Sequence, residues 1–269
     1  MVMTIGIISI KGGVGKTTIA ASLATDLANN YRKRVLLVDA NYGAPNLGLH
    51  MDIVKPDKTI HDVLEGKSHI KNAIHSRFGV HVIPGSYIFD KKLNLLKLKD
   101  KISQIKKNYD FVIVDSSPSL NEEILSTMLA SDNLFIVTTP DYPTLSCSLK
   151  AAKLARQRGR PVSGIIINKI RDPEFELGLK EIEESVGIPV ISRIPDDKMN
   201  IRALFTRIPT SLYKRNSGFS REISKLGAAL TNSREEKSVW KKLFSRNMEK
   251  DEMNRHFLKE SFYSRVFSD

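Results

Sequence analysis

The stretch Lys11-Gly12-Gly13-Val14-Gly15-Lys16-Thr17-Thr18 decides the fold class of this chain. It follows a β-branched run, Thr4 to Ile10, and precedes a helix-forming run from Ile19 to Ala28. In such a strand–loop–helix unit, glycines let backbone N–H groups turn toward phosphate oxygens at the helix amino terminus. Lys16 adds a positive charge, and the Thr17 hydroxyl is a suitable Mg²⁺ ligand. The stretch therefore predicts a nucleotide-binding loop.

Short apolar runs alternate with amphipathic stretches along the rest of the chain, which indicates strands alternating with helices. Residues 35–38 and 111–114 are apolar at every position, as in strands that helices cover on both faces. We therefore expect an α/β fold, a mostly parallel sheet with helices on both faces and a ligand site at the carboxyl ends of its strands. The expected strands are Thr4–Ile10, Arg34–Asp39, Val80–Pro84, Phe111–Asp115, Leu134–Thr139, Val162–Asn168 and Pro189–Ile194.

The composition narrows the class of protein. The chain has 269 residues, 42 Lys and Arg against 30 Asp and Glu, a net charge of +12, and a single cysteine, Cys147. One cysteine forms no intramolecular disulfide and supplies no structural zinc or iron–sulfur site. No apolar stretch approaches the roughly 18 residues that span a bilayer, and the amino terminus lacks a basic leader. We expect a cytoplasmic protein with an anionic partner, which is a nucleotide, a nucleic acid or an acidic lipid.

The chain divides in two near Asn232, where a polar segment gives way to a basic, aromatic tail. Residues 1–232 are expected to form the folded body and residues 233–269 an amphipathic helical tail. The last helix of the body is expected over Ser217–Leu230, whose apolar residues recur at helical spacing.

Residues 11–17 resemble the K-G-G-x-G-K-T loop of the deviant Walker A ATPases, the MinD/ParA family. The general phosphate-loop pattern, G-x-x-x-x-G-K-S/T, has Gly where this chain has Ile10. Residues 35–49, V-L-L-V-D-A-N-Y-G-A-P-N-L-G-L, are similar to the family's switch I. Residues 109–120, Y-D-F-V-I-V-D-S-S-P-S-L, are similar to its Walker B and switch II segments. Residues 164–169 and 194–197 are similar to its adenine-contacting segments. The resemblance implies ATP, Mg²⁺ and an ATP-dependent homodimer in which Lys11 reaches the partner's phosphates.

The resemblance also implies which residues form the site. Chemistry agrees for Asp39 and Asp115, because a carboxylate that ends an apolar strand is costly unless it faces a cation or solvent. Each taken alone could equally cap the following helix. The implied nucleotide-binding residues are Lys11, Gly12, Gly13, Val14, Gly15, Lys16, Thr17, Thr18, Asn168, Lys169, Pro195 and Asp197. The implied metal-binding residues are Thr17, Asp39 and Asp115, and the implied catalytic residues are Lys11, Lys16, Asp39, Asn41 and Asp115.

Asn41 departs from the family's switch I, which commonly reads D-x-D where this chain reads Asp39-Ala40-Asn41. An amide can orient a water molecule but does not accept its proton as a carboxylate does. Because phosphoryl transfer depends mostly on positioning and charge stabilisation, hydrolysis remains feasible. We expect weak basal ATPase activity and a long-lived ATP dimer.

The tail contains the stretch Ser238–Arg246, which places aromatic and aliphatic residues on one helical face and basic residues on the other. This arrangement is typical of a helix lying among lipid headgroups, and it resembles the membrane-targeting helix of MinD members of the family. Two tails in an ATP dimer would bind anionic lipid by avidity. The expected membrane residues are Val239, Trp240, Lys241, Lys242, Leu243 and Phe244.

A second stretch, Met253–Phe267, repeats this pattern and either binds the membrane or docks on the body. Two functions follow. The first is a MinD-like spatial regulator on the cytoplasmic membrane face, with an unknown protein activator or cargo. The alternative is a ParA-like ATPase that binds DNA non-specifically in partition. A run of basic residues is usually only a solvated helix face, but the following residues could form a surface for DNA: Lys150, Lys153, Arg156, Arg158, Arg160, Arg202, Arg207, Lys214 and Arg215.

Overall fold

A computed structural model describes residues 2–89, 91, 93–172, 174–231 and 250–264. The strands are β1 (Met3–Ile8), β2 (Val35–Ala40), β3 (His75–Arg77), β4 (Val80–Ile83), β5 (Phe111–Ser116), β6 (Asn133–Thr138), β7 (Val162–Ile170) and β8 (Val190–Pro195). The helices are α1 (Lys16–Asn29), α2 (Leu47–His50), α3 (Ile60–Glu65), α4 (Leu98–Ser103), α5 (Glu122–Ala130), α6 (Tyr142–Gln157), α7 (Leu179–Val186), α8 (Met199–Thr206), α9 (Thr210–Tyr213), α10 (Gly218–Leu230) and α12 (Lys250–Ser264).

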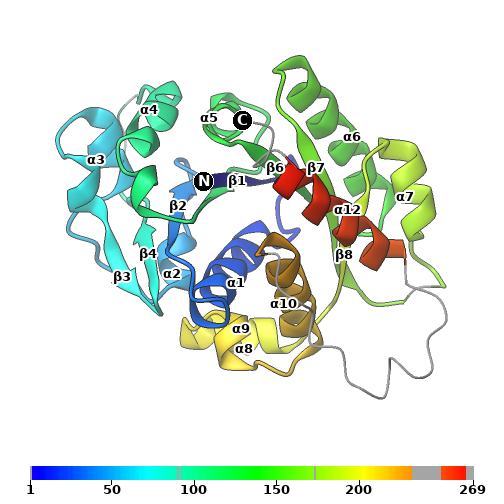
Figure 1. Ribbon diagram of the computed structural model, residues 1–269. Helices are drawn as coiled ribbons and strands as arrows, with labels where there is room; N and C mark the ends of the chain where they lie inside the picture. Colours follow the sequence, from blue (N-terminus) through cyan, green and yellow to red (C-terminus); the bar gives the residue numbers. More distant parts are fainter. Residues whose placement is uncertain (1, 90, 92, 173, 232–249, 265–269) are drawn as a thin grey trace.

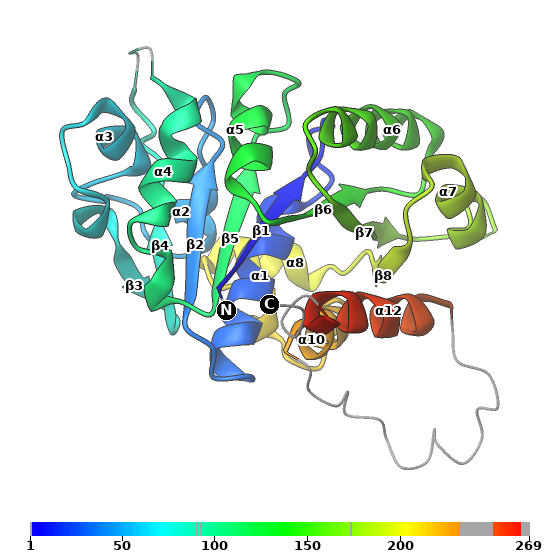
Figure 2. The ribbon, with the colours of Figure 1, turned by 45° about the horizontal axis from the view of Figure 1, so that its top comes forward.

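The strands form one sheet in the order β3-β4-β2-β5-β1-β6-β7-β8. Every neighbouring pair is parallel except β3 and β4. Figures 1 and 2 show helices on both faces, with α1, α10 and α12 on one and α3 to α7 on the other. The predicted α/β fold is confirmed, and each of the seven predicted strands is present. The hydrophobic pattern did not indicate β3, which is a short antiparallel strand at the edge.

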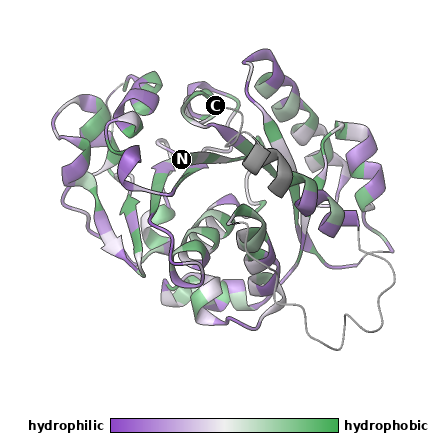
Figure 3. Cartoon of the chain, viewed as in Figure 1, coloured by the Kyte–Doolittle hydropathy of each residue, from purple (hydrophilic) through white to green (hydrophobic). Residues whose placement is uncertain are grey.

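Side chains of the central strands point alternately into two cores, which explains why these strands are apolar at every position. In β2, Val35 and Leu37 belong to the core beneath α1 and α10, while Leu36 and Val38 belong to the core beneath α3 and α4. Figure 3 shows the apolar residues concentrated along the strands and the inward sides of the helices. The rigid central strands thus hold their carboxyl ends in fixed positions for the site.

Helix α12 packs against β8, the edge strand, and against α10 (Figures 1 and 2). Its Leu258 is only 4% exposed and belongs to the core beneath α1 and α10. The sequence predicted that the folded body ends near residue 232, but α12 lies beyond this point and is part of the folded body. Of the two alternatives for Met253–Phe267, the part up to Ser264 that the structure describes therefore docks on the body.

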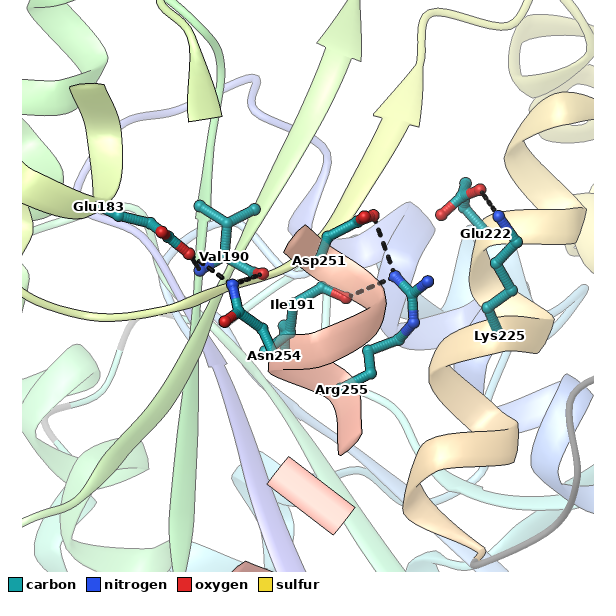
Figure 4. Close-up of polar contacts among 8 residues, drawn as sticks. All are labelled: Glu183, Val190, Ile191, Glu222, Lys225, Asp251, Asn254 and Arg255. Atoms are coloured by element: carbon teal, nitrogen blue, oxygen red, sulfur yellow. Dashed lines mark hydrogen bonds and ion pairs between the residues drawn. The ribbon is translucent and has the colours of Figure 1, made fainter. Parts of the chain in front are cut away.

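Polar side chains fix the position of α12 on the sheet edge, as Figure 4 shows. Arg255 is 2% exposed; its Nη1 lies 3.1 Å from Asp251 Oδ2 and donates to the Ile191 carbonyl oxygen at 3.0 Å. Asn254 Nδ2 donates to the Val190 carbonyl oxygen at 2.8 Å. These side chains bond carbonyl groups of β8, which has no further strand beside it in the part of the chain that the structure describes.

None of the described helices is both long enough and apolar enough to cross a membrane. The predicted membrane segment, Val239–Phe244, lies outside the residues that the structure describes.

Candidate functional site

The predicted phosphate loop lies between β1 and α1, and its backbone requires glycine at two positions. Gly13 and Gly15 have φ angles of +78° and +97°, in the left-handed region that favours glycine. A Cβ atom on Gly15 would also lie 2.3 Å from Asn168 Nδ2, so the Asn168 side chain would have to move. The loop therefore holds a tight conformation at the amino terminus of α1, where backbone N–H groups favour an anion.

Thr17 connects this loop with the end of β5. Its hydroxyl lies 2.7 Å from Asp115 Oδ2 and 3.0 Å from Asn46 Oδ1. Asp115 is fully buried, and its second oxygen, Oδ1, has no hydrogen-bond partner among the described residues. A buried carboxylate oxygen without a partner is costly, so its presence points to a missing cation or donor.

Asp39 lies beside Asp115, because β2 and β5 pair in parallel with these two residues in register. Asp39 is 1% exposed and accepts the backbone N–H groups of Asn41 at 3.0 Å and Leu47 at 3.1 Å. Burial, together with the nearby Asp115, raises the pKa of Asp39 to about 8. Burial raises the pKa of Asp115 to about 6, although the Thr17 hydrogen bond and the charge of Lys16 lower it.

Lys16 is a buried cation whose charge acts on Asp115. It is 7% exposed, and its Nζ lies 3.5 Å from the Lys11 carbonyl oxygen. Burial lowers the pKa of Lys16, and the opposing influence of Asp115 only partly offsets this. When both carboxyl groups are ionised, Lys16 balances only one of the two negative charges, so a second cation would be stabilised here. Asp115 Oδ1, which has no hydrogen-bond partner among the described residues, and the Thr17 hydroxyl are oxygen ligands of the kind that Mg²⁺ prefers. These residues therefore fit the ion.

The end of β7 contacts the opposite side of the phosphate loop. Asn168 Nδ2 donates to the Val14 carbonyl oxygen and Lys169 Nζ to the Gly13 carbonyl oxygen, both at 2.7 Å. The Asn168 side-chain oxygen is buried and has no partner among the described residues, so it can accept a hydrogen bond from a ligand. Lys169 adopts φ +61°, a conformation uncommon for residues other than glycine.

Pro195 is the last residue of β8 and Asp197 follows it, beside the end of β7. Asp197 accepts the backbone N–H of Met199 at 2.9 Å and that of Phe219 at 3.4 Å. It therefore joins the start of α8 to the start of α10. Pro195 lies against the first residue of α10, since a Cβ on Gly218 would come within 2.9 Å of its Cγ. The structure thus places both residues at the carboxyl edge, where they were predicted to contact a base.

Asn41 is 8% exposed, and its side-chain Nδ2 donates to the Ala44 carbonyl oxygen at 2.6 Å. The next residues are also held in place, since Gly43 N–H donates to Glu123 Oε1 on α5 at 3.1 Å. The amide of Asn41 therefore stabilises the switch I turn, a use of its donor group that a carboxylate could not replace.

The predicted residues gather as follows. The structure brings together Gly13, Val14, Gly15, Lys16, Thr17, Asp39, Asp115, Asn168 and Lys169, with Asn41 attached through Asp39. Lys11 and Gly12 are exposed on the outer side of the loop, and Thr18 lies in the first turn of α1.

Sequence reasoning missed Asn46 as an individual site residue. An Asn directly ahead of a helix usually signals a cap, but the Asn46 side chain makes no capping bond to α2 and accepts from Thr17 instead. The similarity of residues 35–49 to switch I covered this position without identifying its role.

Comparisons with known proteins agree with this geometry. A family model described as an AAA domain matches residues 2–151. An uncharacterised ATP-binding protein of Methanocaldococcus jannaschii is 32% identical over 245 residues, covering 90% of this chain and 92% of that protein. The septum site-determining protein MinD of Thermotoga maritima is 30% identical over 230 residues, covering 80% of this chain and 83% of that protein. The solved structure of the septum site-determining protein MinD of Pyrococcus horikoshii, complexed with Mg-ADP, has a TM-score of 0.80 and 28% identity, covering 84% of this chain and 95% of that one.

Proposed function

The chain belongs to the MinD/ParA family of P-loop ATPases, and we propose that it is a slow, Mg²⁺-dependent ATPase that dimerises with ATP on a membrane surface. In this proposal the protein is a spatial regulator at the cytoplasmic face of the membrane. The pair of buried carboxyl groups, Asp39 and Asp115, carries the proposal, because their burial together is explained by a bound cation.

Each part of the site has a distinct task in this proposal. The amino terminus of α1 and Lys16 bind the phosphates, and Thr17 with Asp115 would hold Mg²⁺, assisted by Asp39. The bound ion would supply neutralising charge to the phosphate oxygens. Asn168 accepts a hydrogen bond from the base, while Lys169 and the Pro195–Asp197 segment complete that side of the site. Asn41 orients water without removing its proton, so we expect slow turnover.

ATP binding is the first test. Titration of the purified protein with ATP should give saturable binding that weakens when Mg²⁺ is removed. Lys16→Ala should lose at least about 100-fold in affinity or turnover, because it removes the cation at the phosphates. Lys71→Ala, which changes an exposed lysine outside the site, is the matched control. Equal binding by the Lys16 and Lys71 variants would contradict the proposed site.

Dimerisation is tested by light scattering of the full chain. Addition of ATP should double the molar mass, and ADP should not. Lys11 is exposed at the outer side of the loop, where it could reach the phosphates of a second copy. Lys11→Ala should therefore bind ATP as a monomer. A Lys11 variant that dimerises as the wild type does would contradict the role proposed for this side chain.

Membrane binding by the tail is tested with vesicles that contain anionic lipid. Because α12 is part of the folded body, substitutions are preferable to deletion of the whole tail. Trp240→Ser combined with Leu243→Ser removes apolar area from the expected membrane face and should abolish ATP-dependent sedimentation with the vesicles. Leu96→Ser, at a half-exposed residue of the body, is the control. Full binding by the tail variant would refute the role of this segment.

The alternative is a ParA-like function. Its support is the exposure of basic residues on and after α6, namely Lys150, Lys153, Arg156 and Arg158. ATP-dependent binding to duplex DNA that falls steeply with salt, without vesicle binding, would favour this alternative.

A further inference from the structure

Helix α8 leaves an apolar face in solvent. Ile201, Leu204 and Phe205 are 74%, 47% and 89% exposed, and Ala203 is the one buried residue of this helix. Positions 201, 204 and 205 lie at i, i+3 and i+4, so these side chains share one face. A helix of a globular domain ordinarily turns such a stripe toward the core. Contiguous exposed apolar side chains of this size indicate a surface that contacts something else.

The same surface is strongly basic. Residues 198–216 include Lys198, Arg202, Arg207, Lys214 and Arg215 and no Asp or Glu. All five are exposed, and α9, within this segment, packs against α8 (Figure 1). Asp52 lies 3.9 Å from Arg207, but it also pairs with Arg77 at 2.6 Å. Asp196 and Asp197 directly precede this segment; Asp196 pairs with Arg171, and Asp197 accepts the backbone N–H of Met199. The surface therefore keeps an excess of positive charge around its apolar centre.

We propose that the α8 surface, formed by Lys198, Ile201, Arg202, Leu204 and Phe205, is a second contact of this protein with anionic lipid. Large apolar side chains ringed by Lys and Arg fit the boundary between acyl chains and negatively charged headgroups. This inference rests on the proposed membrane function and adds a contact within the folded body to the tail segment.

Two other occupants fit the surface less well. A nucleic acid would use the cations but would leave Phe205 and Ile201 without a partner, since phosphate contacts are made by charged and polar groups. A second copy of this chain, placed by a two-fold axis through this surface, would set the same cations against one another. Anionic lipid is the partner that satisfies both the charge and the apolar area.

We expect the α8 surface of one protomer to bind anionic lipid only weakly. Each Lys or Arg near an anionic surface strengthens binding by about fivefold. Because the surface lies on the rigid body, it adds to any lipid contact of the tail and sets which side of the body faces the membrane.

The experiment follows the tail and the body with separate probes in the full chain. Trp240 is the sole Trp and Cys147 the sole Cys, so the intrinsic fluorescence reports on the tail. In a Cys147→Ser background, Phe205→Cys carries a polarity-sensitive dye. A dye on Leu96→Cys is the control, because Leu96 is 50% exposed and follows Leu95, which packs against the core on the other face of the sheet. Vesicles of anionic phospholipid, vesicles of neutral phospholipid and duplex DNA are added with ATP.

With anionic vesicles we expect blue shifts of the dye at position 205 and of Trp240, and no shift of the dye at position 96. Ile201→Ser combined with Phe205→Ser should weaken anionic-vesicle binding by about tenfold or more. A shift of Trp240 without a shift at position 205 would overturn the inference and leave the proposed function intact. No shift at either position would reject both. A response at position 205 to DNA but not to vesicles would also overturn the inference.

Discussion

Two pairs of buried charged groups occupy opposite parts of the sheet and are compensated in different ways. Asp39 and Asp115 lie in register on the central strands β2 and β5, so two carboxyl groups of like charge are neighbours. Asp251 and Arg255 lie one turn apart on α12 at the β8 edge, with opposite charges 3.1 Å apart. The charges of the first pair can be balanced only by groups outside the pair, whereas the two charges of the second pair balance each other.

The difference separates a ligand site from a structural contact. Burying like charges together costs free energy, and a fold retains such a pair where a bound cation recovers the cost. Burying an opposite pair fixes position and register, and removal of one partner is strongly destabilising. Raised carboxyl pKa values mark the first pair, while hydrogen bonds from Arg255 and Asn254 to strand carbonyl groups mark the region of the second.

The largest effect is expected when the oppositely charged pair, Asp251 and Arg255, is broken. Arg255→Met leaves the Asp251 carboxylate buried without its cation, and we expect a loss of about 3–5 kcal/mol in the free energy of unfolding, measured with urea. Arg171→Met is the control, because Arg171 and Asp196 form an exposed pair worth less than about 1 kcal/mol. The double variant Asp251→Leu, Arg255→Met should recover much of the loss. An Arg255 variant no less stable than the Arg171 variant would contradict the structural role.

The second test removes one member of the like-charged pair. Asp115→Asn should lower ATP turnover by at least about 100-fold, because it removes the charge that holds the cation. The same variant should melt at a higher temperature than the wild type without nucleotide, since one buried carboxyl group is gone. Asp110→Asn, at a partly exposed residue just before the same strand, should retain full turnover. A drop in both turnover and melting temperature would assign Asp115 to packing.

The third test uses pH. The pKa of Asp39 is about 8 in the fold against an ordinary value of 3.8, so the folded state holds a proton that the unfolded state has lost. Its contribution to stability is therefore present below about pH 4 and is lost as pH rises toward 8. Asp39→Asn should thus gain about 1–3 kcal/mol over the wild type between about pH 5 and pH 8.5. Asp57→Asn, at an exposed residue, should show no such trend. A pH-independent difference would contradict the like-charge interpretation.

The smallest effect is expected from a substitution that adds a third carboxylate near Asp39 and Asp115. Asn41→Asp supplies a group that can accept the proton of the attacking water, so turnover should rise by about two- to tenfold. The gain is limited because the new side chain no longer donates to the Ala44 carbonyl oxygen. Steady-state phosphate release measures the change, with the exposed Asn72→Asp as control. Fast wild-type turnover that the substitution leaves unchanged would reject the role of Asn41.

The sequence predicted the central strands well because each is buried on both faces and reads as an unbroken apolar run. It did not predict β3, His75–Arg77, whose three polar residues lie at the sheet edge, with Ser76 and Arg77 exposed. It also placed the end of the folded body too early. The pattern of Met253–Phe267 interleaves Arg255 with apolar residues and leaves its surroundings open, whereas the structure buries Arg255 against β8. Arg is mostly exposed in proteins, and the burial of Arg255 depends on a partner, Ile191, that is distant in the sequence.

The site was predictable as far as its motifs extend. The phosphate loop, Asp39 and Asp115 stand at the ends of apolar runs, and strand pairing brings them together. The acceptor role of Asn46 and the bond from Asn168 to the Val14 carbonyl oxygen depend on contacts between distant segments, which no local pattern encodes. The membrane role of Val239–Phe244 stays a prediction.

Helix α12 also has a consequence for the behaviour of shortened chains. The β3 end of the sheet is protected by being short and polar, but β8 is a six-residue strand of mostly apolar residues. A chain that stopped at residue 231 would leave the Val190 and Ile191 carbonyl groups without their side-chain donors. An open strand of this kind is a template for pairing with another polypeptide. We therefore expect that loss of the carboxyl-terminal helix promotes aggregation, which would first appear as poor solubility.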